Sequence, residues 1–291
     1  MNYYDQLEKA INFIEQNLCE DIKVEAVAGV AGYSYFHFHR IFEAVLGETV
    51  GNYIRLRRLT SAAYDIVYTD RRILDIALTY RFDSQEAFSR AFKKLYKVTP
   101  REYRKNRIET VIGSKKKMTT MGLKHLMNRV TVQPMIKEVL DIKIIGMRSK
   151  ATINNNLIPK MWNDFNPRIL EIESRTPQLR GYGICEVNPN YNMYEFNEDA
   201  EFNEIVGVEV ENYDTIPPGM IAKALAGGKY AIFTHRGSVE FLRMTYQYIW
   251  GTWIIYSKYE VDLRDDFEFY DERFLGPNHD SSEFDIYIPI K

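Results

Sequence analysis

The sequence predicts two domains of different class, an all-α domain followed by an α+β domain. Three observations lead to this expectation: a length of 291 residues, helical apolar spacing before about residue 110, and strand-like segments after about residue 130. Hydrophobic residues make up 45% of the chain and charged residues 27%, which is ordinary for globular domains. We expect the helical domain at residues 1–110, a linker at 111–129 and the α+β domain at 130–291.

The helical part opens with an amphipathic segment and contains an internal repeat. Leu7, Ile11, Ile14 and Leu18 follow the three-and-four spacing of one helix face. The repeat is found about fifty residues apart, in the pairs Phe38 with Phe88, Arg40 with Arg90, Phe42 with Phe92, Tyr53 with Tyr103, and Arg57 with Arg107. Before the turn the offset is one residue shorter, so the second copy has one extra residue in its turn.

Each copy has the parts of a helix-turn-helix unit. A small residue, Ala28 or Ala77, allows two helices to approach closely, and the following turn holds Gly32 in the first copy and the capping residue Ser84 in the second. Phenylalanines at i and i+4 then anchor a second helix to the core and leave its other face free for a DNA major groove. A helical bundle without DNA is the alternative, but two copies at fixed spacing favour DNA binding.

The net charge divides in the same way as the fold classes. Residues 1–117 hold 20 Lys and Arg against 15 Asp and Glu, whereas residues 118–291 hold 18 against 25. The first part therefore suits a phosphate-bearing partner and the second repels one. Within 111–129, the run Lys115–Lys117 is interpreted as part of a solvated linker rather than as a phosphate contact.

Residues 5–107 resemble the DNA-binding domain of AraC/XylS-type regulators. Residues 72–105, RILDIALTYRFDSQEAFSRAFKKLYKVTPREYRK, are similar to that family's signature nearly throughout. The resemblance implies seven helices, with two homeodomain-like helix-turn-helix units joined by a long helix at about residues 50–68. One chain then places two recognition helices in successive major grooves of double-stranded DNA, so the operator is asymmetric.

The resemblance also assigns the exposed residues of the two recognition helices. The expected DNA contacts are Tyr35, Phe36, His39 and Arg40 in the first helix and Gln85, Glu86, Arg90, Lys93 and Lys94 in the second. Arginine can bind guanine through two hydrogen bonds, and a phenylalanine can contact a thymine methyl group. Glu86 has two interpretations: it accepts a hydrogen bond from cytosine, or it compensates the charge of the helix N-terminus.

In the second part, the sequence predicts the order strand, helix, strand, strand, and this order occurs twice. The two similar halves are expected to build an antiparallel sheet. Near the C-terminus, alternation places Glu268 and Tyr270 on one face of a strand, and Asp285 and Tyr287 on one face of the next. Both strands are thus expected to offer a carboxylate and a phenol to one side of the sheet, near the aromatic helix that carries Trp250. This chemistry suits an apolar cation, and the alternative is a solvated sheet face.

Residues from about 135 to the end resemble the GyrI-like effector-binding domain, in which two βαββ halves enclose a ligand groove. The resemblance places Glu268 inside the groove, and Asp285 lies where family members often have Glu. Trp250 and Tyr270 are expected as walls of the groove, with Tyr182 and Glu186 closing its other side. The order of the two domains resembles that of Rob-type regulators.

These features predict a sequence-specific transcription regulator, and an activator in contact with RNA polymerase, whose activity depends on a small-molecule effector. A hydrolase using Glu268 and Tyr270, or a receiver for a protein partner, remains the alternative for the second domain. We expect no cofactor and no metal. Cys19 and Cys185 are interpreted as buried free thiols of a cytoplasmic protein, and neither a signal peptide nor a membrane span is expected.

Overall fold

The computed structural model describes residues 3–187 and 196–291, which form two compact units. The first unit contains residues 3–128 and 196–197 together with Arg243–Ser257, and the second contains 129–187, 198–242 and Lys258–Lys291. Among the described residues, no helix is long and apolar enough to cross a membrane.

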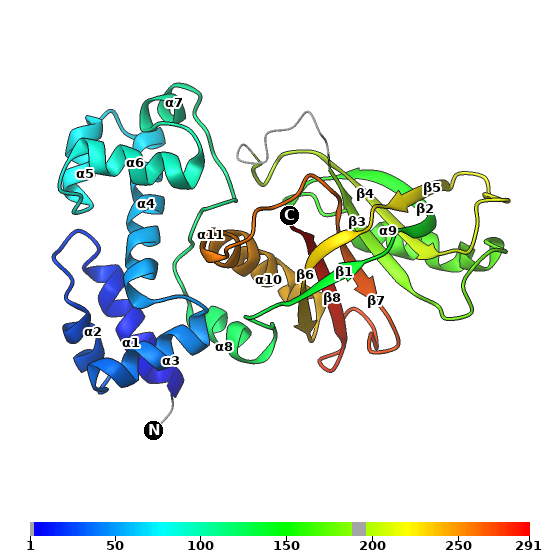
Figure 1. Ribbon diagram of the computed structural model, residues 1–291, viewed down its shortest axis with the longest axis horizontal. Helices are drawn as coiled ribbons and strands as arrows, with labels where there is room; N and C mark the ends of the chain where they lie inside the picture. The colour runs from blue at the N-terminus through cyan, green and yellow to red at the C-terminus, as the bar shows by residue number, and fades with distance from the viewer. Residues whose placement is uncertain (1–2, 188–195) are drawn as a thin grey trace. The chain divides into compact units, whose positions relative to one another are not determined.

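The first unit is helical. Its first eight helices are α1 (Tyr3–Gln16), α2 (Val24–Val30), α3 (Tyr35–Leu46), α4 (Val50–Tyr68), α5 (Ile73–Thr79), α6 (Gln85–Tyr96), α7 (Pro100–Lys105) and α8 (Thr120–Asn128). Helix α4 has 19 residues and is therefore about 28 Å long. In Figure 1 it joins the group α1–α3 to the group α5–α7. The predicted long connecting helix at 50–68 is confirmed.

The two helix-turn-helix units share a left-handed residue in the turn but differ in turn length and in the capping of the second helix. Gly32 in the first turn has a φ of 71°, and Arg81 in the second has a φ of 63°. The N-cap of α3, Ser34, follows Gly32 by two residues, whereas the N-cap of α6, Ser84, follows Arg81 by three, so the predicted extra residue lies in the second turn. The Ser84 side chain accepts a hydrogen bond from the Ala87 backbone N–H at 3.1 Å, and Ser34 makes no such bond.

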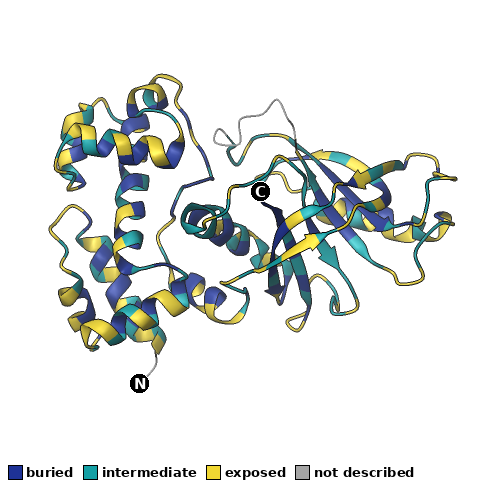
Figure 2. Ribbon diagram, viewed as in Figure 1, coloured by how far each residue is buried: buried dark blue, intermediate teal, exposed yellow. Residues whose placement is uncertain are grey.

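The repeated phenylalanines anchor both recognition helices to the core of this unit. Phe38, Phe42, Phe88 and Phe92 are each fully buried. Figure 2 shows the resulting division of α6 into a buried and an exposed face. Each fully buried aromatic side chain contributes on the order of 2 kcal/mol from removal of its surface from water, and this fixes the rotation of each helix about its axis.

Residues 111–129 differ from the expected linker in two respects. Helix α8 forms in its second half, because Leu123 and Leu126 are buried against neighbouring helices. Lys115 has only 4% of its surface exposed, so its interpretation as part of a solvated linker is wrong.

Cys19, expected to be buried, is exposed.

A helical segment between two strands of the second unit completes the first unit. It contains α10 (Leu242–Tyr248), a π-helical turn η4 (Ile249–Trp253) and α11 (Ile254–Tyr256). Ile255 and Tyr256 pack against the core that α4, α5 and α6 share. The Tyr256 hydroxyl donates a hydrogen bond to the Asn52 carbonyl at 3.2 Å. Residues expected to belong to the α+β domain thus pack on helices of the first unit.

The described residues of the second unit form one antiparallel eight-stranded sheet in the order β1-β6-β8-β7-β3-β4-β2-β5. The strands are β1 (Met135–Val139), β2 (Ile142–Ala151), β3 (Gly181–Glu186), β4 (Phe202–Glu209), β5 (Ile221–Leu225), β6 (Gly228–Arg236), β7 (Asp266–Tyr270) and β8 (Glu283–Pro289). Within the described ranges, the second unit also contains the helical segments α9 (Ile158–Phe165), η1 (Asn166–Glu171) and η3 (Val239–Phe241).

The predicted βαββ repeat is present in the topology. The first half runs β2, α9, β3, β4 and the second runs β6, α10, β7, β8, and the two halves join where β3 pairs with β7. Each edge strand pairs with the half that it does not directly precede in the chain. Strand β1 comes before the first half but pairs with β6 of the second, and β5 comes before the second half but pairs with β2 of the first. The join places Gly183 of β3 directly opposite Glu268 of β7, at the middle of the sheet.

The two faces of the sheet carry separate apolar clusters. Helix α9 covers one face, where Met161 and Phe165 pack against Val206 and Val208 of β4. On the opposite face, Ile184, Ile205, Tyr230 and Phe267 form a second cluster, with other residues of β2, β3, β5 and β6. We call the face covered by α9 the helix face and the other the outer face.

Candidate nucleic-acid interface and ligand site

Helix α3 presents an aromatic and basic surface to solvent. Phe36 has 80% of its surface exposed and Tyr35 has 38%, and Arg40 is also exposed. The Tyr35 and Phe36 rings meet edge to face, with centroids 5.4 Å apart. An exposed phenylalanine has no role in the core of this unit, whereas it fits apolar contact with a thymine methyl group.

His39 differs from its expected place in the exposed set. It is half-buried, its ring packs on Tyr35 at 4.5 Å, and its Nε2 atom is buried without a hydrogen-bond partner among the described residues. That nitrogen is therefore turned away from the exposed face. The inward orientation follows from helical spacing, because position 39 lies beside the anchor Phe38 rather than opposite it.

Helix α6 presents all five of its expected residues to solvent. Gln85, Glu86, Arg90, Lys93 and Lys94 are all classed as exposed. Gln85 and Glu86 lie in the first turn of the helix, which is the part that a recognition helix inserts into the groove. Lys93 and Lys94 lie in the last turn, where they also complement the negative end of the helix dipole.

Glu86 serves the helix N-terminus. A hydrogen bond from its own backbone N–H, followed by one from Ser84, lowers the pKa of the Glu86 carboxyl below its ordinary value. The carboxylate thus satisfies donors that the first turn of a helix leaves free. The lowered pKa is in keeping with charge compensation at the helix N-terminus, and the contact of Glu86 with cytosine stays a prediction.

A buried ion pair lies directly behind the end of α3. The Lys115 Nζ atom is 2.5 Å from Glu48 Oε1 and donates a hydrogen bond to the Thr252 hydroxyl at 2.6 Å. The Glu48 and Lys115 side chains are 0% and 5% exposed. Gly47, with a φ of 72°, leaves the space that the Tyr248 hydroxyl occupies. The segment α10–α11 is therefore bound to the residues that end the first recognition helix.

In the second unit, Glu268 lies on the helix face of the sheet. It has 6% of its surface exposed and is paired with Gly183 on one side and Ile286 on the other. Side chains paired across antiparallel strands share a face. A Cβ atom on Gly183 would lie 3.1 Å from Glu268 Oε2, so the glycine provides the space in front of this carboxylate.

Tyr270 and a set of aromatic rings border Glu268. The Tyr270 hydroxyl donates a short hydrogen bond to Glu268 Oε2. Its ring meets Trp162 of α9 edge to face at 5.5 Å and lies 4.9 Å from Phe284 of β8. Burial, together with the Glu268 charge, raises the pKa of Tyr270 well above its ordinary value, so the phenol stays protonated and keeps this hydrogen bond.

Two further carboxyl groups lie on the same face. Glu204 of β4 is paired with Cys185, and Asp266 of β7 is paired with Cys185 from the other side. Glu204 has 3% of its surface exposed, and a Cβ on Gly183 would lie 3.4 Å from its Oε1 atom. Burial first, and then the charges of Glu268 and Asp266, raise the pKa of Glu204 well above its ordinary value. Burial also raises the pKa of Asp266, to about 7.

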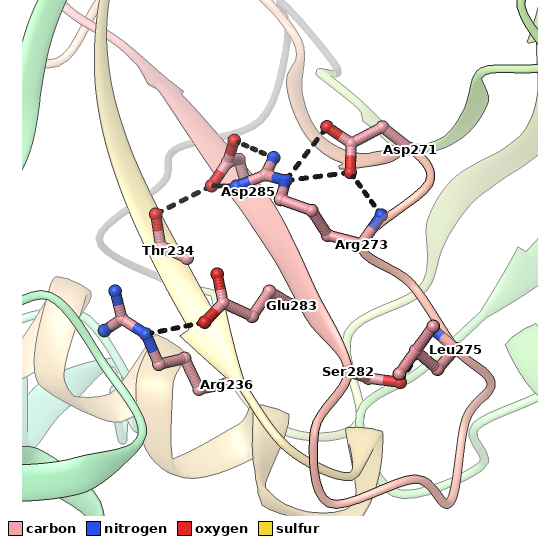
Figure 3. Close-up of polar contacts among 8 residues, drawn as sticks. All are labelled: Thr234, Arg236, Asp271, Arg273, Leu275, Ser282, Glu283 and Asp285. Carbon is pink, nitrogen blue, oxygen red and sulfur yellow. Dashed lines mark hydrogen bonds and ion pairs between the residues drawn. The ribbon is translucent and has the colours of Figure 1, made fainter.

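Asp285 lies on the outer face, and the expectation that it shares a side of the sheet with Glu268 is wrong. The register pairs Phe269 with Asp285 and Glu268 with Ile286, which puts the two carboxylates on opposite faces. Figure 3 shows the Asp285 carboxylate between the Thr234 hydroxyl, at 2.8 Å, and the Arg273 guanidinium, at 2.6 Å. Asp285 is thus already neutralised by a residue of this chain.

Tyr182 and Glu186 also lie on the outer face and do not border Glu268. The Tyr182 ring packs on Phe267 at 5.8 Å, and its hydroxyl donates a hydrogen bond to Glu209. The Glu186 carboxylate forms ion pairs with Arg148 and Lys223, at 2.8 and 2.9 Å. The reason is positional: in β3 the residues facing Glu268 are Gly183 and Cys185, one position away from each expected residue.

Trp250 belongs to the first unit, whereas Glu268 belongs to the second. The Trp250 carbonyl accepts a hydrogen bond from the Gly113 backbone N–H at 3.2 Å. Of the six residues expected in the ligand groove, the second unit therefore brings together Glu268 and Tyr270. In the part of the chain that the structure describes, no group of three or more His, Cys, Asp or Glu residues is arranged to hold a metal ion.

Comparison with known families decides the assignment of both parts. Residues 132–291 match the family described as the GyrI-like small molecule binding domain, and residues 27–106 match a helix-turn-helix domain family. The chain belongs to the AraC-type transcription regulators that carry a GyrI-like small-molecule-binding domain.

Individual relatives agree with this family. The transcriptional regulator Rob of Salmonella typhimurium is 31% identical over 231 residues, which cover 77% of this chain and 76% of that protein. The right origin-binding protein of Escherichia coli K12 is 32% identical over 230 residues, with the same coverage. YbfP of Bacillus subtilis, an uncharacterized HTH-type transcriptional regulator, is 53% identical over 104 residues, but these span only 36% of this chain and 35% of that protein.

Within the GyrI-like domain of this AraC-type regulator, sequence reasoning missed Glu204. The signal was present, because alternation in the segment Glu204–Val208 places Glu204 on the same face as Val206 and Val208. A carboxylate that shares a face with buried apolar residues is itself predicted to be buried. Trp162 of α9 was missed for a different reason, since its contact with Tyr270 joins a helix and a strand far apart in the sequence.

Proposed function

We propose that this AraC-type regulator reads an asymmetric DNA site with α3 and α6 and that a small apolar cation held at Glu268 changes this reading. The observation that supports DNA reading is the pair of exposed helix faces on one rigid frame. Both helices are anchored by fully buried phenylalanines, and α4 links them over about 28 Å. Successive major grooves on one face of DNA are about 34 Å apart, so both helices can engage one duplex.

Selection of binding sequences from a random duplex pool tests the two-groove proposal. The selected site is expected to contain two unlike blocks separated by about one helical turn. Arg40→Ala is expected to remove base preference from one block and Arg90→Ala from the other, each at a cost of about 1–3 kcal/mol in specific binding. A palindromic site would show that the arginines do not read separate blocks. An equally large loss of affinity for unselected DNA in both variants would show the same.

The cation proposal is supported by the charges around Glu268. Glu204, Asp266 and Glu268 share one face near the join of the two sheet halves, and aromatic rings of Trp162 and Tyr270 lie beside them. Neither Glu204 nor Asp266 forms an ion pair with a described residue. Buried carboxylates with aromatic neighbours attract an apolar cation through charge and cation–π interaction.

We propose that this site binds without turnover. Tyr270 is held protonated as a hydrogen-bond donor to Glu268, which makes the pair a fixed acceptor site rather than a base and acid poised for proton exchange. Incubation with simple carboxylic esters is expected to give hydrolysis rates that are the same for the wild type and for Glu268→Gln. Faster hydrolysis by the wild type would establish an enzyme.

Coupling between ligand and DNA is proposed to run through the segment α10–α11. This segment lies between β6 and β7 in the chain, and β7 carries Glu268. Within the first unit it contacts the recognition frame through Thr252 to Lys115 and through Tyr256 to Asn52. We expect activation of transcription with purified RNA polymerase from a selected site, and Thr252→Val is expected to reduce the response to cation more than DNA binding itself.

A further inference from the structure

The buried carboxyl group of Glu204 has no described partner in the protein. It has 3% of its surface exposed, and no described residue forms a hydrogen bond or ion pair with it. Burial, followed by the charges of Glu268 and Asp266, raises the pKa of this group well above its ordinary value. A carboxyl group that is buried without a partner from the described residues is costly to ionise, which indicates a role outside the stability of the fold.

The space beside Glu204 is the one that Glu268 also borders. A Cβ atom placed on Gly183 would lie 3.4 Å from Glu204 Oε1 and 3.1 Å from Glu268 Oε2. The two oxygens come from β4 and β7, the strands on either side of β3. Gly183 places no side chain between the two carboxyl groups, and its neighbour on the same face, Cys185, is small.

We propose that the helix face of the sheet at Gly183 binds ligands with two cationic groups, with Glu268 holding one group and Glu204 the other. The inference rests on the proposed cation site at Glu268 and names a second specificity-determining residue in it. A monocation neutralises one carboxylate and leaves the other group buried, where only its protonated form is tolerated. A dication allows both groups to ionise, with each charge paired, so it gains an interaction that a monocation of the same shape cannot make.

The test compares two cations of matched shape. The probes are 1,1′-dimethyl-4,4′-bipyridinium, which carries two charges, and 1-methyl-4-phenylpyridinium, which carries one. Their binding to the full chain is measured by isothermal titration calorimetry for the wild type, Glu204→Gln, Gly183→Ala and Glu268→Gln. Glu201→Gln is the control for loss of a carboxylate, because Glu201 is exposed and precedes the same strand.

The wild type is expected to bind the dication about tenfold more tightly than the monocation. Glu204→Gln is expected to remove this preference while leaving monocation affinity within about threefold, and Gly183→Ala is expected to reduce it by filling the shared space. Glu201→Gln is expected to leave both affinities unchanged. Glu204→Gln removes a buried carboxyl group whose ionisation is opposed by burial and by Glu268, so its melting temperature is expected to be equal to or above that of the wild type.

Two results would overturn the inference. Equal affinity of the wild type for both probes would show that the second carboxylate does not hold a charge. Loss of both affinities to the same extent in Glu204→Gln would make Glu204 a general contributor rather than the second site. Failure of the underlying cation site looks different, since then neither probe binds the wild type, or Glu268→Gln leaves both affinities unchanged.

Discussion

Replacing Lys115 with methionine leaves the Glu48 carboxylate buried without its cation. In the wild type the two groups are 2.5 Å apart and their side chains are 5% and 0% exposed, so solvent does not screen the pair. Removing one partner of such a buried pair costs about 3–5 kcal/mol of unfolding free energy, because the remaining charge stays desolvated. We expect this loss for Lys115→Met above neutral pH.

The loss depends on pH in a defined direction. Burial raises the pKa of Glu48, and Lys115 opposes that rise through its charge and hydrogen bond. Without Lys115 the folded-state pKa moves further above the unfolded value. A group of this kind binds more protons in the folded state, so stability falls as pH rises from the unfolded pKa through the folded one. The deficit of Lys115→Met is therefore smaller near about pH 5 than near about pH 8.

Urea unfolding of the full chain, followed by far-ultraviolet circular dichroism, measures both effects. The helices of the first unit dominate this signal. The matched control is the double variant Glu48→Met with Lys115→Met, which removes both charges and is expected to recover most of the lost stability. A deficit below about 1 kcal/mol at about pH 8, or one that does not change with pH, would refute the description of Glu48 and Lys115 as a buried pair.

Other substitutions test separate parts of the structure. Ser84→Ala is expected to cost about 1 kcal/mol of unfolding free energy, and Ser34→Ala clearly less, because only Ser84 caps its helix; equal losses in urea unfolding would contradict this. Lys93→Ala is expected to weaken binding to specific and to random DNA alike, and to lower by about one the slope of log affinity against log salt concentration. Loss of sequence preference in this variant would instead make Lys93 a base contact. Phe267→Ala is expected to destabilise the second unit by about 3–5 kcal/mol in thermal or urea unfolding, since its ring is 2% exposed and stacks on Tyr287 at 4.5 Å; a loss below about 1 kcal/mol would not fit that packing.

The helical half was predictable because its determinants are local. Apolar spacing set which face of each recognition helix is buried, and the repeat located the extra turn residue before Ser84. Local sequence did not reveal α8, whose first residues are Thr120, Met121 and Gly122. That helix depends on burial of Leu123 and Leu126 against other helices, which is a tertiary effect.

The ligand site was less predictable because it depends on register between strands. Alternation correctly placed Glu268 and Phe267 on opposite faces of the sheet, and likewise Asp285 and Phe284. Whether Glu268 and Asp285 share a face depends on how β7 and β8 pair, and a shift of one residue reverses the answer. Lys115 was misjudged for a related reason: its partners, Glu48 and Thr252, are distant in sequence.

The measurement that most directly tests the regulator as a whole is DNA affinity with and without a cationic probe. The full chain is titrated onto a selected DNA site at fixed salt, for the wild type and for Glu268→Gln. We predict that the dication changes the wild-type dissociation constant by about threefold or more, and that Glu268→Gln keeps its DNA affinity but loses this response. An equal response in both proteins, or none in a wild type shown to bind the probe, would contradict control of DNA reading through Glu268.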